Sequence, residues 1–355
     1  MRDAERVASH RIQKNGRMKL TRRKIAVLLI ATLLSGPTQA AEPKEPVRII
    51  QSTSSAAFMP YLIGLTMGYF DEAGLEVEVI QTSSGSKVAA AVASRAADVG
   101  MTATSTSLFL RNEGVDIVLL APMTRQYTTG VVFSQDWAKK HGIKADSPYS
   151  EKLAALKGAR LGTPGGSAGE HILRYLANEA GINPDRDLTI VPMGSDLGTY
   201  QVGLEQGVLD GFSLSPPSPD LAIKDLGAVY AFNLSVGEVP ALDNFLYTVA
   251  ITNGAWVQEN PDTARKVVAA IRKSAAAMLD DSTSDTVRDQ VRQEYFEGIA
   301  PEQFSDIWEQ AKSYVPQDMR IENADVEKVL NFSNRFVEGS KMDPEIIEGS
   351  FYITE

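Results

Sequence analysis

The chain has 355 residues, of which 43% are hydrophobic, and this is enough to form two domains with separate cores. It contains no cysteine, which excludes a disulfide framework, a thiolate metal site and a cysteine nucleophile. Its formal net charge of −10 argues against binding to nucleic acid, whose phosphates repel an acidic protein.

Residues 1–40 are predicted to be an export signal. A basic segment at 19–24 precedes a short apolar run at 25–34, and the stretch ends in the small residue Ala40. The apolar run is too short to span a membrane, and the alternative of a core helix does not explain the basic segment before it. We therefore expect a periplasmic protein.

The details of export stay open in the sequence. Met18 is an alternative start to Met1, and Arg22-Arg23 leaves a twin-arginine route open beside the general secretory route. Residues 1–40 hold nine Lys and Arg against two Asp and Glu, so their removal leaves 26 basic and 43 acidic residues, a net charge of about −17. An anionic ligand would then need local hydrogen-bond donors.

The stretch 47–107 repeats one unit, in which a strand ends in a hydroxyl-rich loop and a helix follows. The predicted order is strand 47–50, loop 51–55, a helix from Pro60 to a stop at Gly74, strand 77–80, loop 83–86, a helix to Arg95, strand 97–101 and loop 102–107. Helix N-termini carry free N–H groups and partial positive charge, which suits an anion or a polar ligand head. Ordinary helix capping is the alternative for any one loop.

Within this stretch the sequence resembles a known family. Gly68-Tyr69-Phe70, Gly74-Leu75 and Val77-Glu78 have the spacing found in substrate-binding proteins of nitrate/sulfonate/taurine-type ABC importers. Ala97-Asp98-Val99-Gly100 resembles the family's Gly-x-x-Asp-x-Gly, with Arg95 in place of the first glycine. The resemblance implies an α/β type II periplasmic binding protein, in which two lobes, each a sheet flanked by helices, are joined by two crossover strands.

The next part of the chain repeats the order of the first. The predicted elements are strands 115–121 and 129–134, a strand from 159, the glycine-rich loop 162–169, helix 170–180, strand 188–191 and the Gly207-Val208-Leu209-Asp210 turn before loop 213–219. The glycine-rich loop lacks the Gly-Lys-Ser/Thr of a nucleotide-hydrolysing P-loop. We expect it to approach a small ligand through its backbone.

The last part returns to the first lobe and is mostly helical. A strand ends at Ile251, and a long helix begins with Asn260 as its cap and Pro261 in its first turn. Further helices are predicted at 287–297, 301–314 and 324–339. The expected organisation is a signal at 1–40, lobe 1 at 41–128 and 244–355, and lobe 2 at 129–243.

Candidate ligand-binding residues come from the loops that follow strands. They are Ser54, Ser55, Phe58, Ser84, Gly85, Ser86, Thr104, Arg125, Tyr127, Gly166, Ser167, His171, Ser215 and Pro216. Arg125 is either a guanidinium for a sulfonate or carboxylate or a surface residue paired with an acid. His171 is either a ligand contact or a histidine satisfied within the protein. Asp98 and Asp210 lie on equivalent turns and are interpreted as structural.

The sequence therefore predicts a monomeric, non-catalytic solute-binding protein that delivers its ligand to the permease of an ABC importer. We expect no cofactor and no metal ligand set, because no nucleophile–base pair or metal-binding cluster is evident. The expected ligand is a small organic anion, a sulfonate or carboxylate. The alternatives are a pyrimidine-type vitamin precursor, a sensing role beside a membrane receptor, and an enzyme on the same fold.

Overall fold

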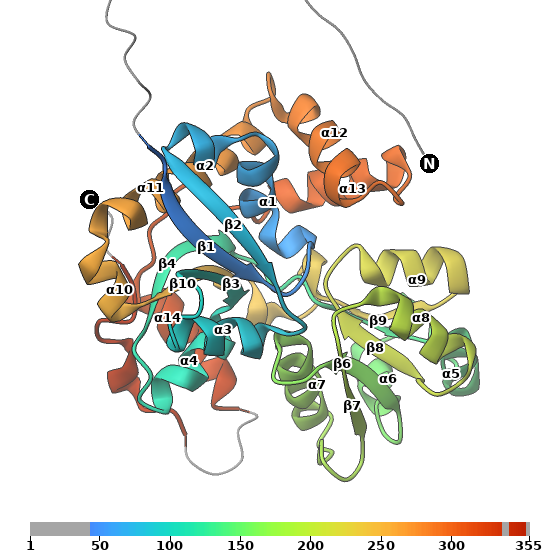
Figure 1. Ribbon diagram of the computed structural model, residues 1–355. Coiled ribbons are helices and arrows are strands. Elements are labelled where there is room, and N and C mark those ends of the chain that lie inside the picture. Colours follow the sequence, from blue (N-terminus) through green and yellow to red (C-terminus); the bar gives the residue numbers. More distant parts are fainter. Residues whose placement is uncertain (1–42, 336–340, 353–355) are drawn as a thin grey trace, which may run out of the picture. The chain divides into compact units, whose positions relative to one another are not determined.

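The computed structural model describes residues 43–335 and 341–352, and the predicted export signal lies outside them. Two five-stranded sheets form the centres of two lobes (Figure 1). The lobe 1 sheet has the order β2 (Leu75–Gln81), β1 (Glu45–Gln51), β3 (Val99–Ala103), β10 (Thr248–Asn253) and β4 (Ile117–Thr124). The lobe 2 sheet has the order β7 (Thr189–Met193), β6 (Arg160–Pro164), β8 (Gly211–Leu214), β5 (Gly130–Phe133) and β9 (Val229–Asn233).

The two sheets have the same topology. In each sheet, the first three strands in this order pair in parallel. The fourth strand runs antiparallel to the third and to the fifth. That antiparallel strand reaches its sheet from the other lobe, since β5 follows β4 of lobe 1 and β10 follows β9 of lobe 2. The two predicted crossings are therefore present, and the two-lobed α/β architecture is confirmed.

Helices cover the sheets of both lobes. Lobe 1 has α1 (Met59–Thr66), α2 (Tyr69–Glu72), α3 (Gly85–Ala93), α4 (Thr104–Asn112), α10 (Gly254–Glu259), α11 (Pro261–Leu279), α12 (Ser284–Tyr295), α13 (Pro301–Lys312) and α14 (Asn323–Ser333), with 3-10 turns η1 (Ala56–Phe58) and η4 (Pro344–Ile347). Lobe 2 has α5 (Gln135–His141), α6 (Tyr149–Ala154), α7 (Ala168–Glu179), α8 (Leu197–Glu205) and α9 (Ser218–Leu226), with 3-10 turns η2 (Leu234–Val236) and η3 (Pro240–Leu242). Of the helices in the described part of the chain, none is long and apolar enough to cross a membrane.

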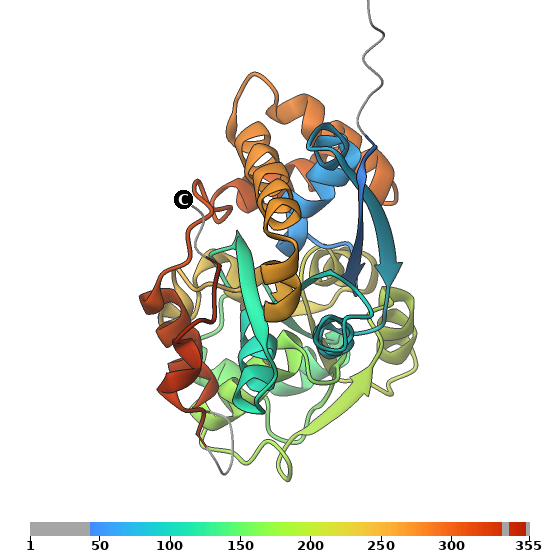
Figure 2. The same ribbon diagram turned by 60° about the vertical axis from the view of Figure 1, so that its left-hand side comes forward.

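The long helix α11 packs on α1, and Figure 2 shows it in orange beside the blue helix. Val267 and Ile271 on its apolar face are completely buried. At the contact, a Cβ added to Gly64 would lie 2.9 Å from the Ser274 hydroxyl oxygen, so this close approach requires glycine.

Two local predictions need correction. The helix expected from Pro60 to Gly74 is two helices, because Gly68 adopts a left-handed φ of 70° between α1 and α2. Asn260 lies at the cap position of α11, but its side-chain amide donates to Trp256 O at 3.0 Å, so it closes α10 and does not cap α11.

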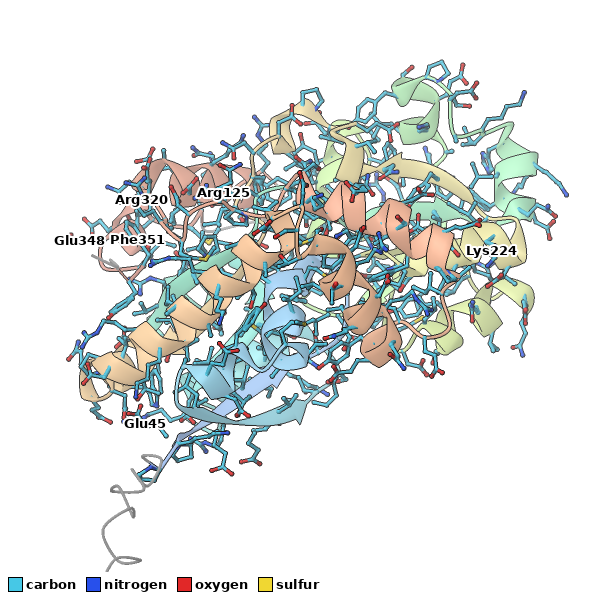
Figure 3. The ribbon with its side chains drawn as sticks, turned by 90° about the horizontal axis from the view of Figure 1, so that it is seen from above. Glu45, Arg125, Lys224, Arg320, Glu348 and Phe351 are labelled. Atoms are coloured by element: carbon cyan, nitrogen blue, oxygen red, sulfur yellow. The ribbon has the colours of Figure 1, made fainter. Side chains whose placement is uncertain are left out.

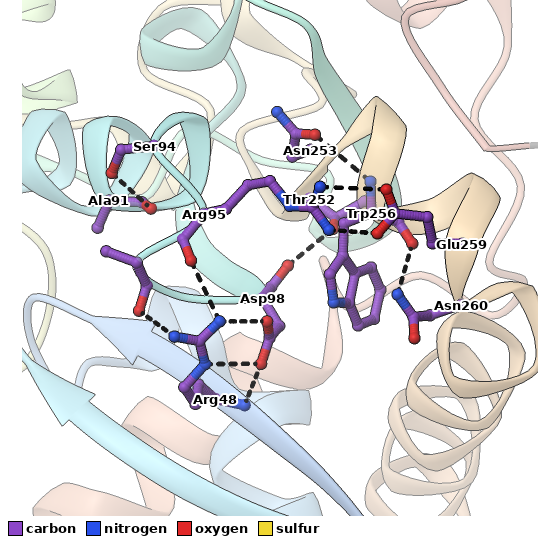
Figure 4. A network of polar contacts seen from close by, with 11 residues as sticks. Arg48, Ala91, Ser94, Arg95, Asp98, Thr252, Asn253, Trp256, Glu259 and Asn260 are labelled. Atoms are coloured by element: carbon purple, nitrogen blue, oxygen red, sulfur yellow. Dashed lines mark hydrogen bonds and ion pairs between the residues drawn. The ribbon is translucent and has the colours of Figure 1, made fainter.

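An arginine–aspartate clamp holds the central strands of each lobe. In lobe 1, Asp98 Oδ2 accepts from the backbone N of Arg48 at 2.8 Å and from its Nε at 3.0 Å (Figure 4). In lobe 2, Asp210 Oδ2 accepts from the backbone N of Arg160 at 2.8 Å and from its Nε at 2.9 Å. Both aspartates directly precede a strand, which agrees with their interpretation as structural residues. The clamps fix β1 against β3 and β6 against β8.

The departure of Arg95 from the family pattern has a structural counterpart. Arg95 has a φ of 60°, and Gly207, at the equivalent turn of lobe 2, has a φ of 65°. The carbonyl of each accepts a hydrogen bond from the clamp arginine of its lobe, at 3.1 Å from Arg48 and 2.8 Å from Arg160. The arginine side chain at position 95 pairs with Glu259 outside the clamp (Figure 4).

We expect Asp98→Ala and Asp210→Ala each to lower the free energy of unfolding by about 1–3 kcal/mol, because each leaves a partly buried backbone N–H and the guanidinium of the same arginine without their acceptor. Urea titration followed by circular dichroism measures this. Asp285→Ala is the matched control, since this carboxylate is 81% exposed in its pair with Arg288 and its loss should cost under about 0.5 kcal/mol. Clamp variants as stable as the control would contradict the account.

Candidate functional site

A cavity of about 90 Å³ lies between the lobes. It is lined by Ser52, Thr53, Ser55, Ala57, Phe58, Gly85, Thr102, Ala103, Thr106, Thr129, Pro164, Ser167, Ala168, Gly169, Ser195, Ser213, Leu214, Ser215, Ser218, Tyr247 and Thr248. Thirteen of these 21 side chains carry a hydroxyl and none carries a charge. At about 10–15 Å³ for each water, the volume accommodates roughly six to nine water-sized groups. We call this space the inner cavity.

Equivalent loops of the two lobes build the inner cavity. In lobe 1 they are the loop after β1 and the junction where α4 directly follows β3, and in lobe 2 they are the loops after β6 and β8. The carboxyl ends of parallel strands form the usual ligand crevice of open α/β sheets. Helix α4 begins directly after β3, and the loops after β6 and β8 lead into α7 and α9. The first turns of these three helices contribute Thr106, Ala168 and Ser218 to the lining. The free N–H groups of these turns add partial positive charge to an otherwise uncharged site.

Three hydroxyls of the lining are buried without a hydrogen-bond partner in the described part of the chain. Ser55 and Thr106 are each 4% exposed, and Ser213 is completely buried. Burial of a hydroxyl without a hydrogen-bond partner costs about 1–3 kcal/mol. A ligand that bonds to these hydroxyls would remove this cost.

Tyr247 closes the wall of the inner cavity. Its hydroxyl shares hydrogen bonds with Thr129 and, at 3.2 Å, with Ser215. Burial raises the pKa of Tyr247, so the phenol remains neutral at physiological pH. The side chain therefore presents a neutral hydroxyl and an aromatic face.

Hydrogen bonds join the lobes around the inner cavity. The backbone N–H of Ala56 donates to Pro216 O at 3.1 Å, and the Ser86 hydroxyl donates to Gly165 O at 3.2 Å. The Ser195 hydroxyl donates to Ser83 O at 3.0 Å. These hydrogen bonds therefore hold the two lobes together around the inner cavity.

His171 is another bridge between the lobes. Its Nδ1 lies 2.9 Å from the Ser105 hydroxyl of lobe 1, and its ring packs on Phe109 with centroids 4.9 Å apart. Burial lowers the pKa of His171 from 6.5 to about 4, so the ring is neutral at physiological pH. It lies outside the inner cavity, which favours the interpretation of a histidine satisfied within the protein.

Of the two interpretations of Arg125, its contacts favour a residue paired with an acid over a guanidinium for the ligand. Its guanidinium forms two hydrogen bonds with the Asp325 carboxylate, at 2.6 and 3.1 Å, and a third with Arg320 O at 2.7 Å. Figure 3 shows Arg125 beside Arg320. The pairing partner comes from α14, 200 residues further along the chain, and no local sequence pattern signals this pair.

The other predicted residues fall into two groups. Those that line the inner cavity are Ser55, Phe58, Gly85, Ser167 and Ser215. Those outside it, besides Arg125 and His171, are Ser54, Ser84, Ser86, Thr104, Tyr127, Gly166 and Pro216. Ser84 caps α3, Tyr127 is completely buried among aromatic rings, and Pro216 and Ser86 bond across the cleft.

Sequence reasoning missed several lining residues. They are Ser52, Thr53, Thr102, Thr106, Thr129, Ser195, Ser213, Ser218 and Thr248. The hydroxyl-rich stretches 51–55, 102–107 and 213–219 held the signal for most of them, since each stretch was recognised as a whole. The stretch 102–107 was predicted as a loop, but its first two residues end β3 and the other four begin α4. Thr129 and Thr248 are on or next to the crossover strands, whose position beside the ligand site is visible only in three dimensions. No group of three or more His, Asp or Glu side chains in the described ranges is arranged to hold a metal ion.

Comparison with known proteins identifies the family. The NMT1/THI5-like family matches residues 55–283, which is more than half of the chain. The chain belongs to this family. YtlA of Bacillus subtilis is 25% identical over 253 residues, which cover 70% of each chain. A 4-amino-5-hydroxymethyl-2-methylpyrimidine phosphate synthase of Saccharomyces cerevisiae is 25% identical over 228 residues, which cover 63% of this chain and 64% of the yeast enzyme.

A solved structure identifies the fold of this NMT1/THI5-like protein. The alkanesulfonate-binding protein SsuA from Xanthomonas axonopodis pv. citri, bound to MOPS, is 14% identical and superposes with a TM-score of 0.68. The match covers 88% of this chain and 99% of that one. The predicted type II periplasmic binding fold is thereby confirmed.

We expect Arg125→Ala to lower the free energy of unfolding by about 1–3 kcal/mol, because it leaves the carboxylate of Asp325, 13% exposed, without its partner. It should leave ligand affinity unchanged within twofold, which isothermal titration measures. A tenfold or larger loss of affinity in a folded variant would restore Arg125 to the site.

Stability should fall in acid partly through His171. The folded pKa is about 4 and the ordinary value is 6.5, so between these values the unfolded chain binds the proton more readily. This contribution to stability is complete above pH 6.5 and decreases towards pH 4, with a slope of at most about 1.4 kcal/mol per pH unit. Thermal unfolding of His171→Gln from pH 7 to 4.5 should show a shallower decrease than the parent. The exposed His141→Gln is the control, and equal slopes in all three proteins would contradict the assignment.

Proposed function

We propose that this protein is an exported, periplasmic solute-binding protein that captures a small organic solute between its lobes and delivers it to the permease of an ABC importer. The observation that carries the proposal is the uncharged, hydroxyl-lined inner cavity, in which Ser55, Thr106 and Ser213 are buried without hydrogen-bond partners among the described residues. Groups in this state are suited to a ligand that supplies the missing partners.

Binding fits this cavity better than catalysis. A serine or threonine nucleophile needs an adjacent base, and none of the lining side chains is an acid, a histidine or a lysine. The Ser167 hydroxyl donates to Pro164 O at 2.5 Å, and the Ser215 hydroxyl bonds to the neutral Tyr247. The yeast relative is named as a synthase, so an enzyme on this fold is the competing hypothesis, and turnover assays with pyrimidine precursors test it.

For the ligand head we propose a small organic anion, a sulfonate or carboxylate, held without a counter-charge. Hydroxyl donors and the helix N-termini of both lobes surround the inner cavity, and no acidic side chain in its lining opposes an anion. The structural likeness to an alkanesulfonate-binding protein supports this class.

A pyrimidine-type vitamin precursor is the second candidate. The family description and the pyrimidine named in the yeast relative favour it, and Phe58 and Tyr247 supply aromatic surface in the cavity wall. A neutral ring would bind by stacking and hydroxyl contacts. Affinity that is insensitive to salt would favour this candidate over an anion.

Delivery would follow from lobe closure. The hydrogen bonds between the lobes around the inner cavity support a ligand-bound form in which the two lobes are held together, and only this form would dock productively on the permease. We propose that the protein acts as a monomer, with lobe 1 at 41–128 and 244–355 and lobe 2 at 129–243. A sensing role beside a membrane receptor would use the same closure, and neighbouring genes for a permease and an ATPase would favour transport.

The unpaired Ser213 hydroxyl gives a sharp test. Ser213→Ala should weaken binding about five- to tenfold, because one hydrogen bond of about 1 kcal/mol is lost. The free protein should be equally stable or more stable, since the variant removes a buried group without a partner. The ligand for this test is the best solute from a thermal-shift screen of sulfonates, carboxylates, nitrate and pyrimidines, in which a concentration of 100 times Kd stabilises by about 2.7 kcal/mol.

Ser94→Ala is the matched control, since the Ser94 hydroxyl bonds to Ala91 O on the exposed end of α3. It should change neither quantity measurably. A Ser213→Ala protein that keeps full affinity for the screened ligand would place the ligand elsewhere.

A further inference from the structure

A second and larger cavity, of about 400 Å³, adjoins the inner cavity. We call it the outer chamber. It is lined by Ser86, Thr106, Phe109, Leu110, Glu113, Gly166, Glu170, His171, Arg174 and Asp185, mostly from α4 of lobe 1 and α7 of lobe 2. Thr106 lines both spaces, and Ser86 and Gly166 are chain neighbours of the inner-cavity residues Gly85 and Ser167. The two spaces therefore meet at a common wall.

The walls of the two spaces differ in chemistry. In the outer chamber, Phe109 packs on the neutral ring of His171, and Leu110 lies beside it on α4. Both Phe109 and Leu110 are half-buried, so they offer apolar surface that a solute can cover. Apolar surface of this kind favours hydrocarbon over water.

The rim of the outer chamber is acidic. The guanidinium of Arg174 forms ion pairs with the carboxylates of Glu170 and Asp185, each at 2.9 Å. The other oxygen of Glu170 accepts from the backbone N–H of Gly166 at 2.8 Å. No hydrogen bond or ion pair connects the Glu113 carboxylate to any described residue. Three carboxylates and one guanidinium leave a formal charge of −2, which repels a negatively charged group.

We propose that the solute has two parts, a polar head in the inner cavity and an uncharged apolar tail of several carbons in the outer chamber. This inference rests on the proposed solute-binding function and specifies its ligand. Thr106 supports it independently, because this residue lines both spaces and its buried hydroxyl has no partner among the described residues. A head-to-tail junction that passes this residue would supply the partner.

Matched pairs of short and long solutes test the proposal by isothermal titration. The pairs are methanesulfonate and hexanesulfonate, acetate and hexanoate, and acetamide and hexanamide. For at least one head, the hexyl compound should bind ten or more times as tightly, since each buried methylene contributes about fourfold. Adipate should bind at least five times as weakly as hexanoate, because its second carboxylate meets the acidic rim. Adipate that binds as tightly as hexanoate contradicts the proposed tail.

Substitution at Leu110 locates the tail. Leu110→Ala should lower the ratio of short-chain to long-chain Kd by about three- to tenfold, and Val208→Ala, at an exposed position on lobe 2, should leave the ratio unchanged. Equal affinities within every pair, a ratio unaffected by Leu110→Ala, or no binding of any hexyl compound would each overturn the proposal. If any of these results is found but another solute from the thermal-shift screen binds, the proposed tail is wrong and the proposed solute-binding function still holds.

Discussion

The arginine–aspartate clamp in each lobe is the interaction on which the site depends. Arg48 with Asp98 and Arg160 with Asp210 fix the register of the central parallel strands at their amino-terminal side. A slip of one residue in a strand would turn every side chain to the opposite face. Because the register is fixed, the loops at the other ends of these strands meet, and their hydroxyls line one cavity.

The lining of the inner cavity is polar but carries no charged side chain. Thirteen hydroxyl groups and several helix N-termini surround the cavity. Two arginines outside the lining are paired with acids, Arg125 with Asp325 and Arg174 with Glu170 and Asp185. A buried counter-charge would carry a desolvation cost in the empty state. Neutral donors carry a smaller one, which is visible here as three unpaired hydroxyls. The arrangement suits a protein that must bind its solute and then release it.

The sequence predicted the parts of the fold that local patterns determine. Strand–loop–helix repeats, the turns at Asp98 and Asp210 and the crossing between lobes all follow from periodicity, glycine positions and the family resemblance. The sequence could not predict contacts between distant segments. Asp325 is 200 residues from Arg125 along the chain, and only folding makes them partners. In the same way, Thr129 and Thr248 reach the cavity because crossover strands pass beside it.

The most direct test of this account is a crystal structure of the exported protein with the best solute from the thermal-shift screen. We expect the head of the solute to lie in the inner cavity, within about 2.7–3.2 Å of the hydroxyls of Ser55, Thr106 and Ser213. We also expect that no charged side chain touches the head. A solute bound outside this cavity, or one paired with an arginine or lysine while these three hydroxyls remain without partners, would contradict the central claim.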